Sequence, residues 1–109
     1  IADVFGADGD VTEFFVSGQD AEKASVQYII DGKQSMTVFK DVRMLVADAI
    51  AAAVALLEDK APNAKGSYNN GVKDVSAIQS AVITVDKANV KSALIDSGYY
   101  NAGDFTGLE

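Results

Sequence analysis

Hydrophobic and polar positions along the chain follow two periods, one typical of strands and one typical of helices. Short runs of aromatic and β-branched residues predict three strands, and longer segments with apolar residues three to four positions apart predict three helices. The expected order is a helix end at 1–5, a turn at 6–10, a strand at 13–17, a helix at 21–30, a strand at 34–39, a long helix at 42–58, a polar segment at 59–71, a strand at 81–85, a helix at 87–97 and a coil tail at 99–109.

Aspartate and glycine residues mark the ends of these predicted helices. Asp20, Asp41 and Asp86 each stand just before a helical segment, where a side-chain oxygen can cap free backbone N–H groups. Gly32 and Gly98 stand just after helical segments, at the position where glycine is favoured. The helix boundaries are therefore predicted by local chemistry as well as by periodicity.

The long helix predicted at 42–58 has an unusually wide apolar surface. Two neighbouring stripes run along it, and the first of them is rich in alanine. They consist of Leu45, Ala49, Ala52, Ala53 and Leu56, and of Val46, Ile50, Val54 and Leu57. A surface of this width indicates a helix that packs closely on more than one side, with a sheet as the expected neighbour.

The alternation of strands and helices predicts an α/β fold with a mostly parallel sheet and covering helices. Three strands are few for a complete sheet. In α/β sheets, ligands bind beyond the carboxyl ends of the strands. Two polar clusters follow strands in this way: Gly18-Gln19-Asp20 after the first strand, and Lys40 after the second.

Composition narrows the range of functions. The chain has 109 residues, the size of one small domain, and 49% of them are hydrophobic, as in a globular protein. With 16 acidic and 9 basic residues, the net charge of -7 argues against a nucleic-acid binder and against docking on an anionic membrane. The longest apolar run, 49–57, has nine residues, whereas a membrane-spanning helix needs about 20, so membrane insertion is not expected.

The absence of cysteine and histidine removes several chemistries at once. Disulfides, thiolate metal sites, cysteine nucleophiles and histidine-based triads are excluded. No other nucleophile, metal or phosphate motif is present, so an enzyme is not expected, and neither a metal nor a cofactor is predicted.

Four segments carry a resemblance to a known family. They are Val16-Ser17-Gly18-Gln19-Asp20-Ala21, Thr37-Val38-Phe39-Lys40, Asn69-Asn70-Gly71-Val72-Lys73-Asp74-Val75 and the stretch 83–94. In this order and spacing they resemble the C-terminal portion of type 1 periplasmic sugar-binding proteins, in the branch of D-xylose-binding and multiple-sugar-binding receptors of ABC transporters. The similarity runs from about residue 14 to residue 99. The first two segments together are specific, whereas the Asn-Asn-Gly turn alone would be weak.

The resemblance implies a receptor that binds a xylose-like aldopentose or aldohexose and delivers it to an ABC importer. It implies that Asp20 and Lys40 hydrogen-bond the sugar. Gln19 is expected to support the binding residues or to act at a hinge instead of touching the sugar. A carboxylate can accept from two adjacent sugar hydroxyls, and an ammonium group donates to a hydroxyl or to the ring oxygen. Without the resemblance, Asp20 would be read as a helix cap and Lys40 as a solvated lysine at a strand end.

The family fold also implies a domain organisation. Residues 1–40 would form part of the C-terminal lobe, 41–66 would belong to the N-terminal lobe, and 67–109 would return to the C-terminal lobe. The chain, which begins at Ile1, would then be a C-terminal fragment with most of the binding cleft outside it. Its expected partners are a monosaccharide, the rest of the receptor or a complementary chain, and the importer's membrane subunits. The expected location is the periplasm or the outer face of the cytoplasmic membrane, with the parent receptor free or lipid-anchored.

Three other functions remain open at this point. Transcription regulators of the lactose-repressor type sense sugars with a similar bilobal core. Related receptors present sugar to a sensor kinase or a chemoreceptor. A fragment could also serve only as an oligomerising domain without a ligand. The segment 16–21 and Lys40 favour the transported-sugar branch over the regulators.

Overall fold

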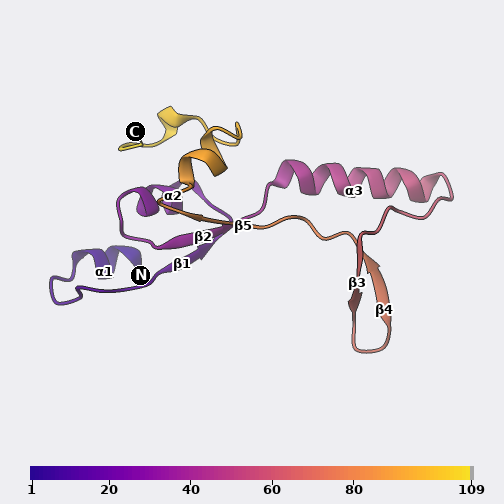
Figure 1. The fold of residues 1–109 in the computed structure, drawn as a ribbon, viewed down its shortest axis with the longest axis horizontal. Coiled ribbons are helices and arrows are strands. Elements are labelled where there is room, and N and C mark those ends of the chain that lie inside the picture. The colour runs from indigo at the N-terminus through magenta and orange to yellow at the C-terminus, as the bar shows by residue number, and fades with distance from the viewer. Residues whose placement is uncertain (109) are drawn as a thin grey trace. The chain divides into compact units, whose positions relative to one another are not determined.

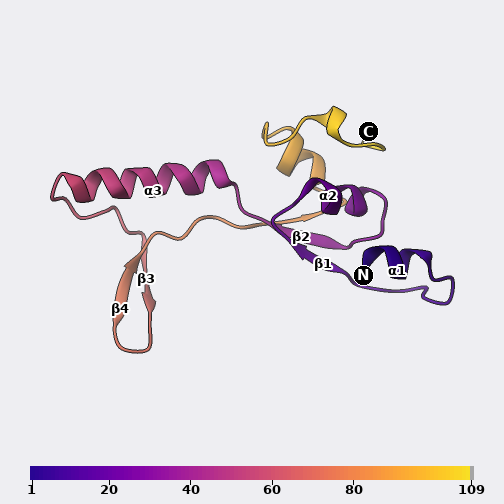
Figure 2. The same ribbon diagram turned by 180° about the vertical axis from the view of Figure 1, so that it is seen from behind.

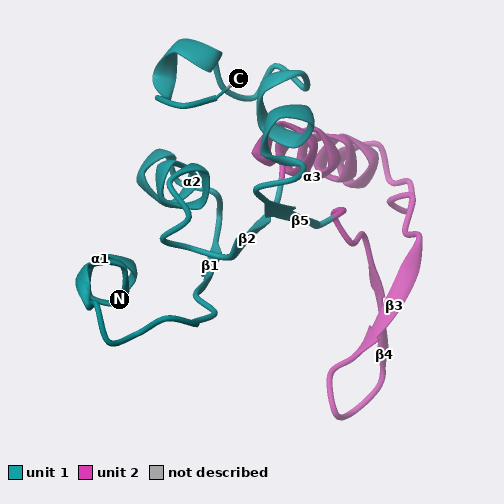
Figure 3. Cartoon of the chain, turned by 60° about the vertical axis from the view of Figure 1, so that its left-hand side comes forward, with its two compact units in different colours: residues 1–40, 82–109 teal, residues 41–81 magenta. Residues whose placement is uncertain are grey.

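The computed structural model describes residues 1–108, and the chain divides into two compact units (Figure 3). Unit 1 comprises residues 1–40 together with the segment from Val82 onward. Unit 2 comprises residues 41–81. The chain therefore leaves unit 1 once and returns to it once, and each unit is described by itself below.

Unit 1 is built around a three-stranded sheet, in which β1 (Ser17–Gln19), β2 (Met36–Phe39) and β5 (Ile83–Asp86) lie in the order β1-β2-β5 (Figure 1). β1 and β2 are parallel, as expected, but β5 runs antiparallel to β2. The other elements of unit 1 are α1 (Ala2–Ala7), α2 (Lys23–Ile30), a π-helical turn at Lys91–Ile95 and a 3-10 turn at Ala102–Asp104.

The direction of β5 corrects the prediction of a mostly parallel sheet. Phe39, the last residue of β2, pairs with Ile83, the first residue of β5. The chain thus leaves the sheet at the carboxyl end of β2 and re-enters it beside that same end. The returning strand, β5, must therefore run in the opposite direction. The α/β class itself is confirmed, since helices and strands alternate along unit 1.

The first strand begins later than its sequence predicts. The aromatic run at 13–16 is not part of the sheet, and the strand is the small, polar segment Ser17–Gln19. Phe15 is 74% exposed, so its side chain does not pack into this core, whereas Val16 is buried. Val16 also anchors the segment, because its N–H donates to Ser35 Oγ and its carbonyl accepts from the Ser35 N–H.

The core of unit 1 lies between the sheet and the elements on one side of it. Figure 2 shows α2 and the chain after β5 on the same side of β2 and β5, and apolar side chains from these elements form the core. The buried cluster consists of Ala21, Val26, Ile30, Phe39, Val85, Val90, Leu94 and Phe105.

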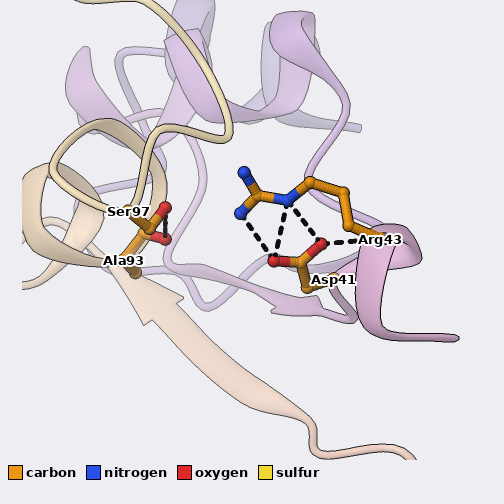
Figure 4. Close-up of polar contacts among 4 residues, drawn as sticks. All are labelled: Asp41, Arg43, Ala93 and Ser97. Carbon is orange, nitrogen blue, oxygen red and sulfur yellow. Dashed lines mark hydrogen bonds and ion pairs between the residues drawn. The ribbon is translucent and has the colours of Figure 1, made fainter. Parts of the chain in front are cut away.

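The segment after β5 is less helical than predicted. Asp86 caps it as expected, since its Oδ1 accepts from the Ala88 and Asn89 N–H groups. The regular part is, however, the short π-helical turn at Lys91–Ile95, followed by a bond from Ser97 Oγ to the Ala93 carbonyl (Figure 4). The tail is not simple coil either, because Asn101 and Asp104 cap each other's backbone around a 3-10 turn.

Unit 2 contains α3 (Val42–Leu57) and an antiparallel hairpin of β3 (Gly66–Asn69) and β4 (Asp74–Ala77). The hairpin strands were not predicted, because all of their residues except the half-buried Ala77 are exposed and they show no apolar alternation. Its turn was predicted. Asn70 Oδ1 accepts from the Val72 and Lys73 N–H groups, and Gly71 adopts a φ of +89°.

α3 begins at the predicted cap. Asp41 Oδ1 accepts from the Arg43 N–H at 2.9 Å, and the Arg43 guanidinium also donates to both oxygens of the Asp41 carboxylate (Figure 4). The hydrogen bonding from the Arg43 side chain lowers the pKa of Asp41. None of the sixteen described residues of α3 is buried, and Leu57, Leu56 and Ile50 are among its exposed apolar side chains.

Candidate functional site

The two residues predicted to bind a ligand lie together in unit 1. Asp20 directly follows β1 and Lys40 directly follows β2, and these strands are parallel neighbours. Lys40 Nζ lies 3.1 Å from Asp20 Oδ1. Two polar clusters that are twenty positions apart in the sequence therefore meet at the carboxyl-terminal edge of the sheet, where α/β proteins place their ligands.

Asp20 does not have the expected role of helix cap. Its φ of +74° and the φ of +50° at Ala21 place both residues in the left-handed region. α2 consequently starts only at Lys23, and among the described residues no side chain caps its first turn. The prediction of an Asp20 N-cap is wrong because these two residues turn the chain before the helix begins. The Asp20 carboxylate is left free to face Lys40.

The turn at Asp20 and Ala21 is held by hydrogen bonds from β2. The Asp20 N–H donates to the Val38 carbonyl at 2.8 Å. The Ala21 N–H donates to Thr37 Oγ1 at 3.3 Å, and both Ala21 and Thr37 are fully buried. The Asp20 carboxylate is thus carried by a hydrogen-bonded turn whose next residue, Ala21, is buried.

Both charged side chains remain accessible. The Asp20 side chain is 62% exposed and that of Lys40 is 36% exposed. An ion pair with this exposure contributes little to stability, typically less than about 1 kcal/mol. Its oxygen and nitrogen atoms can therefore exchange their mutual contact for hydrogen bonds to a polyhydroxylated ligand at small cost.

Gln19, expected to support the site, is the last residue of β1 and pairs with Val38 in the sheet register. Gln19 is exposed and directly precedes Asp20 in the sequence. The structure therefore places Gln19 at the same edge of the sheet as the two charged residues. Its role stays a prediction.

The C-terminal segment, residues 99–108, supplies contacts next to this site that were not predicted from the sequence. Tyr100 Oη donates to the Ala21 carbonyl at 3.0 Å, and Lys23 Nζ lies 2.9 Å from Asp104 Oδ2. This hydrogen bond from Lys23 lowers the pKa of Asp104, while burial raises the pKa of Tyr100. The segment was predicted to be coil, and only its content of aromatic residues could have indicated packing.

The charged groups at this site can bind a ligand through hydrogen bonds. Within residues 1–108, no three acidic side chains come close enough together to hold a metal ion. Over the same residues, no helix is both long and apolar enough to cross a bilayer. The arrangement offers a carboxylate acceptor and an ammonium donor side by side, which suits a ligand with neighbouring hydroxyl groups.

Comparison with known proteins places this site in context. No family model matches the chain. The multiple sugar-binding periplasmic receptor ChvE of Rhizobium radiobacter is 42% identical over 89 residues, which cover 80% of this chain and 25% of the receptor. The D-xylose-binding periplasmic protein of Escherichia coli is 37% identical over 89 residues, or 82% of this chain and 27% of that protein. The chain is homologous to a segment of periplasmic sugar-binding receptors.

Solved structures of such sugar receptors share the fold. A carbohydrate transporter solute-binding protein from Chloroflexus aurantiacus, in complex with D-glucose, is 74% identical and matches with a TM-score of 0.91. The match covers all of this chain and 32% of that one. An ABC transporter solute-binding protein from Clostridium phytofermentans, with bound β-D-glucose, is 37% identical with a TM-score of 0.72 over 83% of this chain.

These comparisons confirm the resemblance to periplasmic sugar-binding receptors that the four sequence segments indicated. The chain spans about a quarter to a third of the length of the receptors that it matches. Those homologues are named as receptors for sugars, and the two solved structures contain a bound monosaccharide.

Proposed function

We propose that this chain forms part of the binding site of a monosaccharide receptor, with Asp20 and Lys40 hydrogen-bonding the sugar. The observation that carries the proposal is the contact of 3.1 Å between Lys40 Nζ and Asp20 Oδ1 at the carboxyl ends of two parallel strands. The sugar would take the place of this contact, accepting from the ammonium group and donating to the carboxylate. Gln19 would support the site from the adjoining position in β1.

The wider role follows from the homologues. A receptor of this kind would capture a xylose- or glucose-like sugar and deliver it to the membrane subunits of an ABC importer, without catalysing a reaction. The periplasmic names of the homologues support a location in the periplasm or at the outer face of the cytoplasmic membrane. Binding through two charged side chains requires no cofactor.

The division into units supports a two-lobed organisation. Unit 1 would belong to the C-terminal lobe of the receptor, and the crossing to the other lobe would lie between Lys40 and Asp41. The return was expected at residue 67, but the hairpin of β3 and β4 groups with α3, which supports a return after Ala81. The remainder of the receptor would then cover the exposed apolar surface of α3.

Calorimetric titration with D-glucose and D-xylose tests the proposal on two proteins. The first is the chain itself, and the second is a chimera in which residues 1–109 replace the matching segment of the Chloroflexus aurantiacus protein. Asp20→Ala in the chimera should weaken sugar binding by about 1.5–3 kcal/mol, the scale of a charged hydrogen bond. Asp10→Ala is the matched control, because it removes a carboxylate of the same kind from an exposed turn of unit 1. It should leave the affinity of the chimera for sugar unchanged.

The two proteins separate the possible results. Binding by the chimera alone would mean that the remaining part of the receptor is needed for affinity. A chimera that binds sugar equally well with and without the Asp20 carboxylate would refute the assigned role of this residue. A folded chimera that binds neither sugar would refute the proposed function of the chain.

A further inference from the structure

The turn that carries Asp20 has an unfavourable backbone conformation. Asp20 and Ala21 are consecutive, neither is glycine, and their φ angles are +74° and +50°. A side chain at positive φ brings Cβ close to the carbonyl oxygen, so this conformation is unfavourable for Ala21, whereas aspartate tolerates it better. Such a conformation persists only where the surrounding structure holds it, and strained residues of this kind gather at functional sites.

Hydrogen bonds reach this turn from two different parts of the chain. β2 accepts from the Asp20 and Ala21 N–H groups through the Val38 carbonyl and Thr37 Oγ1. The Ala21 carbonyl instead accepts from Tyr100 Oη at 3.0 Å, a bond between residues 79 positions apart. Tyr100 is therefore the group from outside the sheet that fixes the carbonyl side of the turn.

Tyr100 is itself held in place by aromatic and polar neighbours. Its ring meets the rings of Tyr99 and Phe105 edge to face, with centroids 4.8 and 5.6 Å apart. The ring of Tyr99 in turn meets the ring of Phe39 edge to face, with centroids 4.6 Å apart. Phe39 is buried and directly precedes Lys40. The row of rings thus connects the end of β2 with the turn that follows β1.

Two polar links tie the C-terminal segment to α2. Lys23 Nζ pairs with Asp104 Oδ2 at 2.9 Å and lies 5.5 Å from the centre of the Tyr100 ring. Gln27 and Thr106 exchange two hydrogen bonds, of 3.0 and 3.1 Å. Burial raises the pKa of Tyr100, so its hydroxyl remains a donor well above neutral pH.

We propose that Tyr100 is a positioning residue, whose hydroxyl holds the Asp20–Ala21 turn so that the Asp20 carboxylate faces Lys40. Its effect on sugar affinity rests on the function proposed above, whereas its effect on the Asp20–Lys40 contact does not. The C-terminal segment thereby becomes part of the binding site without touching the ligand.

Tyr100→Phe tests this role, since it removes the hydroxyl and keeps the ring. Tyr28→Phe is the matched control, because it removes another tyrosine hydroxyl of unit 1, which donates to Asp3 Oδ2 at 2.7 Å. Three quantities are compared: nuclear Overhauser effects between Asp20 Hβ and Lys40 Hε in the full 109-residue chain, the urea midpoint, and the affinity of the chimera for D-glucose.

Tyr100→Phe should weaken the Asp20–Lys40 Overhauser effects and lower affinity about fivefold, the equivalent of one neutral hydrogen bond of ~1 kcal/mol. Tyr28→Phe should change neither. Ala21→Gly relieves the strained position, since glycine adopts positive φ freely, so Tyr100→Phe should cost less affinity when combined with it. If the hydroxyl only stabilised the fold, Tyr100→Phe would lower the urea midpoint. Its effect on affinity would then be the same with and without Ala21→Gly.

The results distinguish the two proposals. Loss of the Overhauser effects in Tyr100→Phe, with no sugar binding by any variant, would support the positioning role and refute the proposed function. Unchanged Overhauser effects in Tyr100→Phe would overturn the positioning role whatever the sugar data show. Absence of these effects in the wild-type chain would overturn it as well.

Discussion

Gly18 lies in β1 at a point where even a methyl group has no room. A Cβ built on this residue would lie 2.3 Å from Gln34 Nε2 and 3.2 Å from Ser25 Oγ. Gln34 is only 8% exposed, and its amide donates to Ser25 Oγ at 2.7 Å and to the Met36 carbonyl at 2.9 Å. Gly18→Ala must therefore displace a buried amide and break the two hydrogen bonds that it makes.

The expected cost follows from these contacts. Crowding a packed interior typically costs 1–3 kcal/mol, and each lost hydrogen bond adds about 0.5–1.5 kcal/mol when its partners cannot bond again. We expect Gly18→Ala to lower the free energy of unfolding by at least about 2 kcal/mol, the lower end of the summed ranges, measured by urea denaturation followed by circular dichroism. Gly9→Ala is the control, because a Cβ at Gly9 meets no atom within 4 Å among the described residues.

A second substitution separates the steric effect from the loss of backbone freedom. Gln34→Ala removes the obstructing amide, so Gly18→Ala should cost less than about 1 kcal/mol in that background. Some cost should remain because of Ser25 Oγ. Gly18→Ala with wild-type stability, or full additivity of the two substitutions, would show that the close packing around Gly18 is not as described.

Three other predictions concern the caps, pH and the hairpin. Asp41→Ala removes the acceptor for the Arg43 N–H and should cost about 1 kcal/mol of α3 stability, seen as lower helicity by circular dichroism. The hydrogen bond from Lys23 lowers the pKa of Asp104. The contribution of the ionised Asp104 side chain to the free energy of unfolding is therefore complete above the ordinary carboxyl pKa of about 3.9, and it is lost as pH falls through the lowered pKa. Asp104→Asn should therefore reduce the fall in urea midpoint below about pH 4. Gly71→Ala, at a φ of +89° in open space, should cost about 1–2 kcal/mol through the backbone alone, measured by faster amide exchange in β3 and β4.

Local chemistry was sufficient to predict the features that depend on neighbouring residues. The caps at Asp41 and Asp86 and the turn at Asn70 and Gly71 are formed as expected, because each is made within a few positions of the chain. The helix of α3 was also predicted within one residue at its C-terminal end. The strands of the exposed hairpin were missed, because they bury no apolar face that would show as a pattern.

Features that depend on distant contacts could not be read from the sequence in the same way. The direction of β5 depends on where the chain re-enters the sheet, next to Phe39. The left-handed turn at Asp20 depends partly on Tyr100, which lies 80 positions later. The expectation that Asp20 binds a sugar came from the resemblance of its segment to sugar-binding receptors, whereas local propensity alone indicated a helix cap.

A crystal structure of the chimera grown with D-glucose tests most directly whether Asp20 and Lys40 bind the sugar. One sugar should occupy the site, with Asp20 and Lys40 each within about 3.2 Å of a sugar oxygen and the turn at Ala21 still bonded to Tyr100. A sugar bound without contact to Asp20 or Lys40 would refute the roles assigned to these two residues.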